Sequence, residues 1–204
     1  MNITRVLLGT QFLRLIDEGK QTDCLIKDGG AALLKQSTPE QENALNLQWI
    51  RLSRPNPFSI GIIVMLLAAS TPWGWTSIIY HFNLPVEVSS ILCLSIIPFA
   101  GIYVAFIPYG LGRGYTSGLI FIRYFYLFNI SLSLAGIFSI LIQNSEFNQL
   151  MRELNTFFLQ LFVLYLCRYT INSNSFYRII SFLRTLRLIL EAKKERELSQ
   201  KSCK

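Results

Sequence analysis

The strongest constraint in this sequence is a run of 23 residues without a charged side chain, from Phe58 to Tyr80. A helix rises about 1.5 Å per residue, so a helix of this length crosses a hydrocarbon core of about 30 Å. Trp73, Trp75 and Tyr80 lie near the end of the run, as aromatic residues do at a membrane–water interface. The run therefore predicts a transmembrane helix, in which Pro72 favours a kink.

Three further stretches predict spans at about residues 88–109, 124–142 and 154–171. Pro98 interrupts the second stretch and predicts a bent helix there. The last stretch has the weakest signal, because only its first 14 residues precede Arg168. Together with the first run, these stretches predict an all-α polytopic membrane protein with a four-helix transmembrane bundle over residues 58–171.

The composition agrees with this fold class. Of the 204 residues, 51% are hydrophobic and 15% are charged, whereas soluble domains are about 25% charged. This balance argues against a disordered chain and against an ordinary soluble domain.

The basic residues that flank the spans predict how the chain is threaded. Arginines stand before the first span, in the 110–118 connection and after the fourth span, whereas the connection between the first two spans has no Lys or Arg. By the positive-inside rule, both termini and the 110–118 connection face the cytosol, or the stroma if the membrane is a thylakoid. A bacterial inner membrane or an organellar membrane is the expected location. This alternation of charge also favours a complete fourth span.

Residues 1–57 are more polar and predict a cytosolic region with two short helices. The first helix is expected over Ile3–Ile16 and the second over Thr38–Leu52, with a turn at residues 28–30 between them. The glycine-rich residues 110–118 predict a flexible loop between spans. They lack the GxGxxG and GK[ST] patterns of phosphate-binding loops.

Residues 172–204 predict a basic amphipathic helix followed by a solvated tail. From residue 175 onward the chain has eight basic and three acidic side chains, a net charge of +5. Residues 172–175 predict a break and an N-cap, and fraying is expected from Lys193. Apolar residues at spacings of three and four form the expected binding face: Phe176, Ile179, Leu183, Leu186 and Leu190. Arginines are the expected contacts to anions, with Arg178 and Arg184 on the opposite, polar face: Arg178, Arg184 and Arg187.

Three roles of this tail helix stay open at the level of sequence. The helix can lie on the membrane surface, with its arginines on anionic lipid headgroups. It can pack under the bundle against the first helix. It can dock a membrane-protein partner or a second copy of the chain. No nucleic-acid-binding motif accompanies the basic residues, so nucleic acid is not an expected partner.

The sequence offers little catalytic chemistry. His81 is the single histidine, the four cysteines form no CxxC pair, no serine lies in a GxSxG motif, and no carboxylate lies inside a predicted span. We therefore expect no enzymatic activity, no cofactor and no metal. The leading expectation is a subunit, scaffold or assembly factor of a membrane complex. A small oligomeric transporter or channel is the alternative, and a lipid-modifying enzyme is the least favoured class.

Three amide side chains lie within the predicted spans: Asn129, Asn155 and Gln160. Their favoured role is interhelical hydrogen bonding, which is common for amides in membrane helices. The second interpretation is that they line a narrow polar path or bind a ligand.

Overall fold

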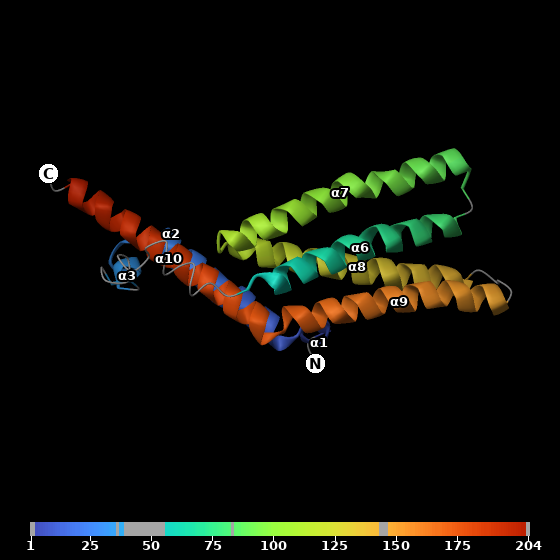
Figure 1. Ribbon diagram of the computed structural model, residues 1–204, viewed down its shortest axis with the longest axis horizontal. Coiled ribbons are helices and arrows are strands. Elements are labelled where there is room, and N and C mark those ends of the chain that lie inside the picture. Colours follow the sequence, from blue (N-terminus) through green and yellow to red (C-terminus); the bar gives the residue numbers. More distant parts are fainter. Residues whose placement is uncertain (1–2, 36, 39–55, 83, 143–146, 203–204) are drawn as a thin grey trace. The chain divides into compact units, whose positions relative to one another are not determined.

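A computed structural model describes residues 3–35, 37–38, 56–82, 84–142 and 147–202 of the chain. These parts form α-helices and contain no strand (Figure 1), which confirms the predicted all-α class. The chain divides into two compact units. The bundle unit comprises residues 60–108 and 121–171. The terminal unit combines three separate segments, residues 1–59, 109–120 and 172–204.

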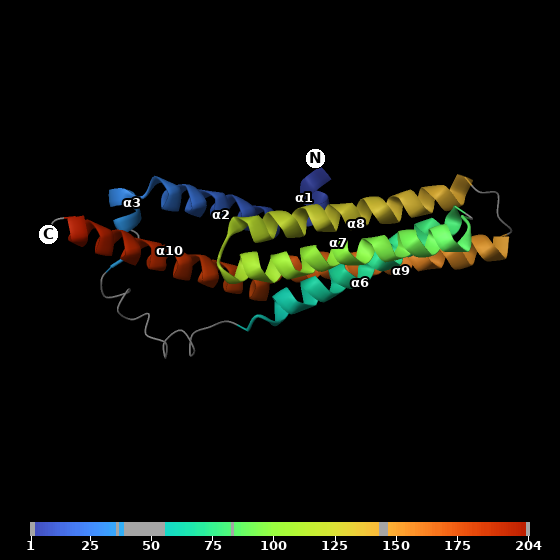
Figure 2. The same cartoon turned by 90° about the horizontal axis from the view of Figure 1, so that it is seen from above.

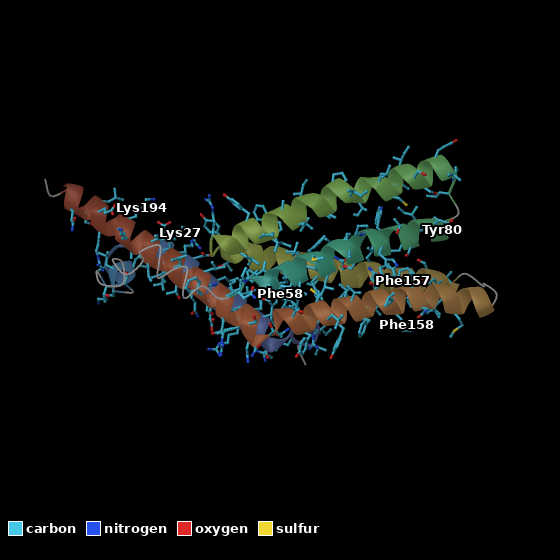
Figure 3. The ribbon with its side chains drawn as sticks, in the orientation of Figure 1. Lys27, Phe58, Tyr80, Phe157, Phe158 and Lys194 are labelled. Carbon is cyan, nitrogen blue, oxygen red and sulfur yellow. The ribbon has the colours of Figure 1, made fainter. Side chains whose placement is uncertain are left out.

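The bundle unit is formed by four long helices, with the α6 span running from Phe58 to Tyr80 (Figure 3). Each predicted span coincides with a helix that is long and apolar enough to cross a membrane, and the four helices fit a multi-pass membrane protein. The helices are α6 (Phe58–His81), α7 (Val86–Gly112), α8 (Thr116–Ile142) and α9 (Phe147–Ile171). The fourth candidate span covers 18 residues, Leu154–Ile171.

The predicted loop at residues 110–118 is shorter in the structure, because α7 continues to Gly112 and α8 begins at Thr116. Gly110 and Gly118 are helical, and they let the two helices approach closely. A Cβ atom on Gly110 would lie 3.2 Å from the Gly118 backbone. Only Gly114, with φ +71°, lies in the turn itself and has a left-handed conformation. The glycines therefore serve close packing more than loop flexibility.

An aromatic cluster joins α7 to α8. The Tyr103 ring stacks on Phe125 at 4.6 Å between centroids and meets Phe121 edge-on at 5.5 Å. Phe99 contacts Tyr103 at 4.9 Å and extends the cluster along α7. Such offset and edge-on arrangements suit the quadrupoles of the rings. They hold together two helices that have few polar groups between them.

Helices α8 and α9 pack through a glycine. Phe157 of α9 is 1% exposed, and a Cβ atom on Gly136 of α8 would clash with its ring. The next residue, Phe158, is 59% exposed and lies on another side of α9 (Figure 3). The missing side chain at Gly136 thus creates the space that the phenyl ring fills.

In the terminal unit, α10 (Asn174–Ser202) lies alongside α2 (Thr10–Asp28), as Figures 1 and 2 show. The short helices α1 (Ile3–Leu8) and α3 (Gly30–Leu34) lie on either side of α2 in the sequence. The predicted continuous helix over Ile3–Ile16 is therefore wrong in its bounds. The chain breaks at Gly9, whose φ is +85°, and α2 then runs twelve residues beyond Ile16.

Two other predictions for this unit are confirmed, and a third lies largely outside the described residues. The turn at residues 28–30 is confirmed, since α2 ends at Asp28 and both following glycines have positive φ. The N-cap is also confirmed, because the Ser173 hydroxyl accepts a bond of 3.2 Å from the Phe176 N–H. The predicted helix over Thr38–Leu52 lies outside the described residues from residue 39 onward.

The predicted fraying from Lys193 onward is wrong, because α10 continues to Ser202. The Arg196 guanidinium donates to the carbonyls of Leu34 and Ser37 and so ties this part of α10 to the end of α3. The Lys, Glu and Arg residues in this stretch also have high intrinsic helix propensity.

The glycine at the α8–α9 contact generates a prediction. Gly136→Ala should lower the free energy of unfolding by about 1–3 kcal/mol, because the added methyl group displaces the buried Phe157 ring. Gly101→Ala is the matched control, since a Cβ at Gly101 of α7 meets no atom within 4 Å. Thermal unfolding in detergent measures both variants. Equal stability of the two would contradict the packing described above.

Candidate functional site

The first residues of the predicted apolar stripe lie on the side of α10 that faces α2. Phe176, Ile179 and Leu183 are buried, with exposed fractions of 0%, 0% and 5%. Leu186 is half-buried and Leu190 is exposed. Farther along α10 a different side is covered, since Ile189 and Ala192 are buried and Arg196 bonds to the α3 end. The stripe is thus an internal packing face over its first half, and Leu190 remains at the surface.

Arg184 lies within this interface, and its predicted place on the polar face is wrong. Its side chain is 7% exposed, and its guanidinium donates to the Leu15 carbonyl of α2. The Glu18 carboxylate lies 4.0 Å away. Burial lowers the pKa of Arg184 from its ordinary value, whereas Glu18 and Asp23 act in the opposite direction. Gly19 provides the space, because a Cβ there would lie 2.6 Å from the guanidinium.

Arg187 connects three segments of the terminal unit. It forms an ion pair with Asp23 of α2 and donates a bond of 3.3 Å to the Gly114 carbonyl in the α7–α8 turn. Its guanidinium also lies 4.3 Å from the centre of the Tyr115 ring, in cation–π geometry. A Cβ on Gly114 would lie 2.6 Å from the Leu183 carbonyl, so the turn can approach α10 only with glycine there.

Glu18 is the main acceptor on α2. It accepts a bond of 2.7 Å from Arg14, and both of its oxygens lie 3.4 Å from the Tyr177 hydroxyl of α10. With Arg184 at 4.0 Å, one carboxylate serves donors from both helices. Sequence reasoning did not identify Glu18 or Asp23 as partners of the tail arginines.

The predicted anion contacts therefore have different environments. Arg184 and Arg187 bind groups of their own chain, whereas Arg178 is exposed. Among the three roles left open for the tail helix, packing against the N-terminal helical region has structural support. Contacts of these arginines with lipid headgroups or with partner proteins stay predictions.

The polar residues of the bundle are used in two interhelical contacts. Asn129 of α8 is fully buried, and its Oδ1 lies 3.0 Å from the hydroxyls of Ser70 and Thr71 of α6. Gln160 of α9 is 1% exposed and donates a bond of 3.0 Å to the Ser70 carbonyl. Asn155 is exposed and does not join them. Two of the three predicted residues thus form hydrogen bonds to the same turn of α6, at Ser70 and Thr71.

Gly74 permits the second of these contacts, because a Cβ there would clash with the Gln160 amide. The sequence shows Gly74 one turn after Ser70, but it does not show which helix supplies the polar partner.

The described residues contain no group of three or more His, Cys, Asp or Glu side chains that could hold a metal ion. A depression of about 400 Å³ at the α6–α7 connection is lined by apolar, hydroxyl and thiol groups: Tyr80, Leu84, Val86, Ser89, Ser90 and Cys93. This lining includes no carboxylate, imidazole or cationic group. The comparisons with known proteins also supply no function, since no family model, curated protein or solved structure matches the chain.

The α2–α10 interface generates the second prediction. Glu18→Gln should destabilise the terminal unit by about 1–3 kcal/mol, because it leaves the buried Arg184 guanidinium with a neutral neighbour. Asp17→Asn is the control, since Asp17 is an exposed acidic residue on the same helix. Hydrogen exchange of the α10 amides measures the effect. Equal protection in both variants would show that the Glu18 carboxylate does not hold α10.

Proposed function

We propose that the protein is a non-enzymatic subunit, scaffold or assembly factor of a membrane complex. The observation that carries this proposal is the terminal unit, in which the N-terminal helices, the α7–α8 turn and α10 join into one compact body. Its arginines are used to hold these segments together, as the Arg187 contacts show. A body fixed in this way presents a constant surface beside the membrane, which suits the binding of a protein partner.

We infer that the terminal unit lies on the cytosolic side, or on the stromal side of a thylakoid. The contacts of Arg187 with Asp23 and Gly114 support one common side for the N-terminal segment, the turn and the tail. Two candidate spans separate each segment from the next, which is the even number that a common side requires. The arginines and lysines concentrated in these segments favour the cytosolic side.

The partner surface that we propose is the outer side of the second half of α10. Leu190 and Leu198 are 52% and 54% exposed and lie eight residues apart, a spacing that brings side chains to one side of a helix. Lys193 and Lys194 are exposed between them. A partner with an apolar groove and acidic margins fits this pattern.

The third prediction tests this surface in the protein's own membrane. Native mass determination after gentle extraction should give a stoichiometric complex with another protein. The double variant Leu190→Glu with Leu198→Glu should lose that partner and remain helical by circular dichroism. Thr185→Glu is the control, because Thr185 is exposed on the same helix. A native mass that corresponds to the wild-type chain alone or to a homo-oligomer would contradict the subunit proposal.

The transporter or channel alternative has less support. Asn129 and Gln160 form hydrogen bonds to Ser70 of α6, and these bonds give both amides a structural role in the bundle. The alternative requires the same amides to contact a passing solute or ion.

The fourth prediction separates these two roles. Asn129→Leu should lower the free energy of unfolding by about 1 kcal/mol, the usual size of an interhelical hydrogen-bond contribution in membranes. Asn155→Leu should have little effect, because Asn155 is exposed. Thermal unfolding in detergent is paired with solute and ion flux in liposomes that contain the pure protein. Flux that disappears with Asn129→Leu at unchanged stability would favour the transporter.

A further inference from the structure

The short helix α1 of the terminal unit exposes apolar side chains. Ile3 and Val6 are 73% and 47% exposed, whereas Leu8 at the end of the same helix is fully buried. At 3.6 residues per turn, Ile3 and Val6 lie about 140° and about 160° around the helix from Leu8. The helix therefore buries one side against its own chain and leaves an apolar side exposed.

The side chain of Asn172 fixes the position of α1 within this unit. Its Nδ2 donates a bond of 2.7 Å to the Leu8 carbonyl, and its Oδ1 accepts a bond of 3.3 Å from the Phe12 N–H in the first turn of α2. The amide fills the space beside Gly9, where a Cβ atom would overlap it. One side chain thus bonds to the end of α1 and to the start of α2, and it holds the junction between them.

Asn172 lies at the membrane boundary along the chain, because it directly follows Ile171, the last residue of the fourth candidate span. The headgroup layer on each side of a bilayer is about 5–8 Å thick. Ile3 lies about 8 Å along the helix axis from Leu8, and Val6 lies about 3 Å from it. Both exposed apolar side chains are therefore held within about one headgroup layer of the residue at the boundary.

The apolar side of α1 is distinct from the surface proposed on the second half of α10. Helices α2 and α10 start together, with the Phe12 and Phe176 rings 6.4 Å apart, and farther along Asp23 pairs with Arg187. The two helices thus run in the same direction away from Asn172. Leu190 lies about 24 Å along the axis from the start of α10. The exposed side chains of α1 and those of distal α10 consequently belong to opposite ends of the terminal unit.

We propose that α1 lies in the headgroup layer of the membrane, with Ile3 and Val6 in contact with lipid acyl chains. Interfacial helices bury their apolar side about 5–10 Å into the boundary between headgroups and acyl chains. Arg5 is exposed on the same helix and suits contact with headgroup phosphates. Two aliphatic side chains are too few for the roughly 800 Å² that each partner contributes to a stable protein interface, so lipid is the favoured occupant. This contact is independent of the partner surface proposed on α10.

Photo-crosslinking of the full-length chain in phosphatidylcholine vesicles tests the proposal. An amino acid with a diazirine side chain replaces Ile3 or Val6, and after illumination mass spectrometry measures the share of chains that carry a lipid adduct. This share should be about tenfold higher at either position than at Gln21, because a side chain among acyl chains reacts with lipid and one in water reacts with water. Gln21 is the matched control, since it is exposed on α2 and lies farther from the boundary.

Two results of this experiment would overturn the proposal. The first is an equal share of lipid adducts at the positions of Ile3, Val6 and Gln21, which would place α1 in water. The second comes from the same experiment in the protein's own membrane. If positions 3 and 6 are crosslinked to another protein in place of lipid, the apolar side of α1 is a protein-docking surface.

A substitution at Asn172 tests how α1 is held at the boundary. Asn172→Asp keeps an acceptor for the Phe12 N–H but loses the donor to the Leu8 carbonyl, so the lipid adduct at position 3 should fall about threefold. Asn174→Asp is the control, because it makes the same change in charge and keeps the acceptor for Gln11. An unchanged yield in Asn172→Asp would contradict the placement of α1 by Asn172. The comparison of positions 3, 6 and 21 needs neither variant and decides the proposal even if Asn172→Asp does not fold.

Discussion

The organisation of the terminal unit depends on one guanidinium group. Arg187 of α10 binds the Asp23 carboxylate of α2, lies over the aromatic face of Tyr115 and donates to the Gly114 carbonyl. These partners come from segments that two candidate spans separate in the sequence. Arginine suits this position because its planar fork can serve several acceptors and still stack on a ring. The arrangement also requires Gly114, since a side chain there would meet the Leu183 carbonyl.

The spans could be predicted from the sequence because lipid leaves few structural options. Backbone groups in a hydrocarbon core must bond within their own segment, so an apolar run of about twenty residues forms a helix. The helix ends were harder to predict, because glycine serves both turns and close packing. Residues 110–118 illustrate this difficulty, since Gly110 and Gly118 allow helices to approach and only Gly114 forms the turn. Local sequence does not distinguish these uses.

The candidate sites were only partly predictable, for a related reason. The spacing of the apolar residues correctly placed Phe176, Ile179 and Leu183 on one face of the helix, and the structure shows that these three residues are buried. Arg187 follows Phe176 by eleven residues, which is close to three full helical turns, so the spacing already brings Arg187 near the apolar face. Arg184 follows Phe176 by eight residues and lies about 80° away from it around the helix, so the spacing favoured the polar side for this residue. What the sequence could not supply was the acidic partners on α2, because those contacts span about 160 residues of chain.

The arginines of this chain thus have different roles because their neighbours differ. In the terminal unit, Glu18 and Asp23 lie within reach of Arg184 and Arg187, and the positive charges are balanced inside the protein. Arg178 of α10 is instead exposed. A charge at the edge of a hydrocarbon layer is costly unless an opposite charge or water reaches it. A basic tail therefore does not by itself indicate a lipid-binding surface, because carboxylates of a distant segment can bind its arginines.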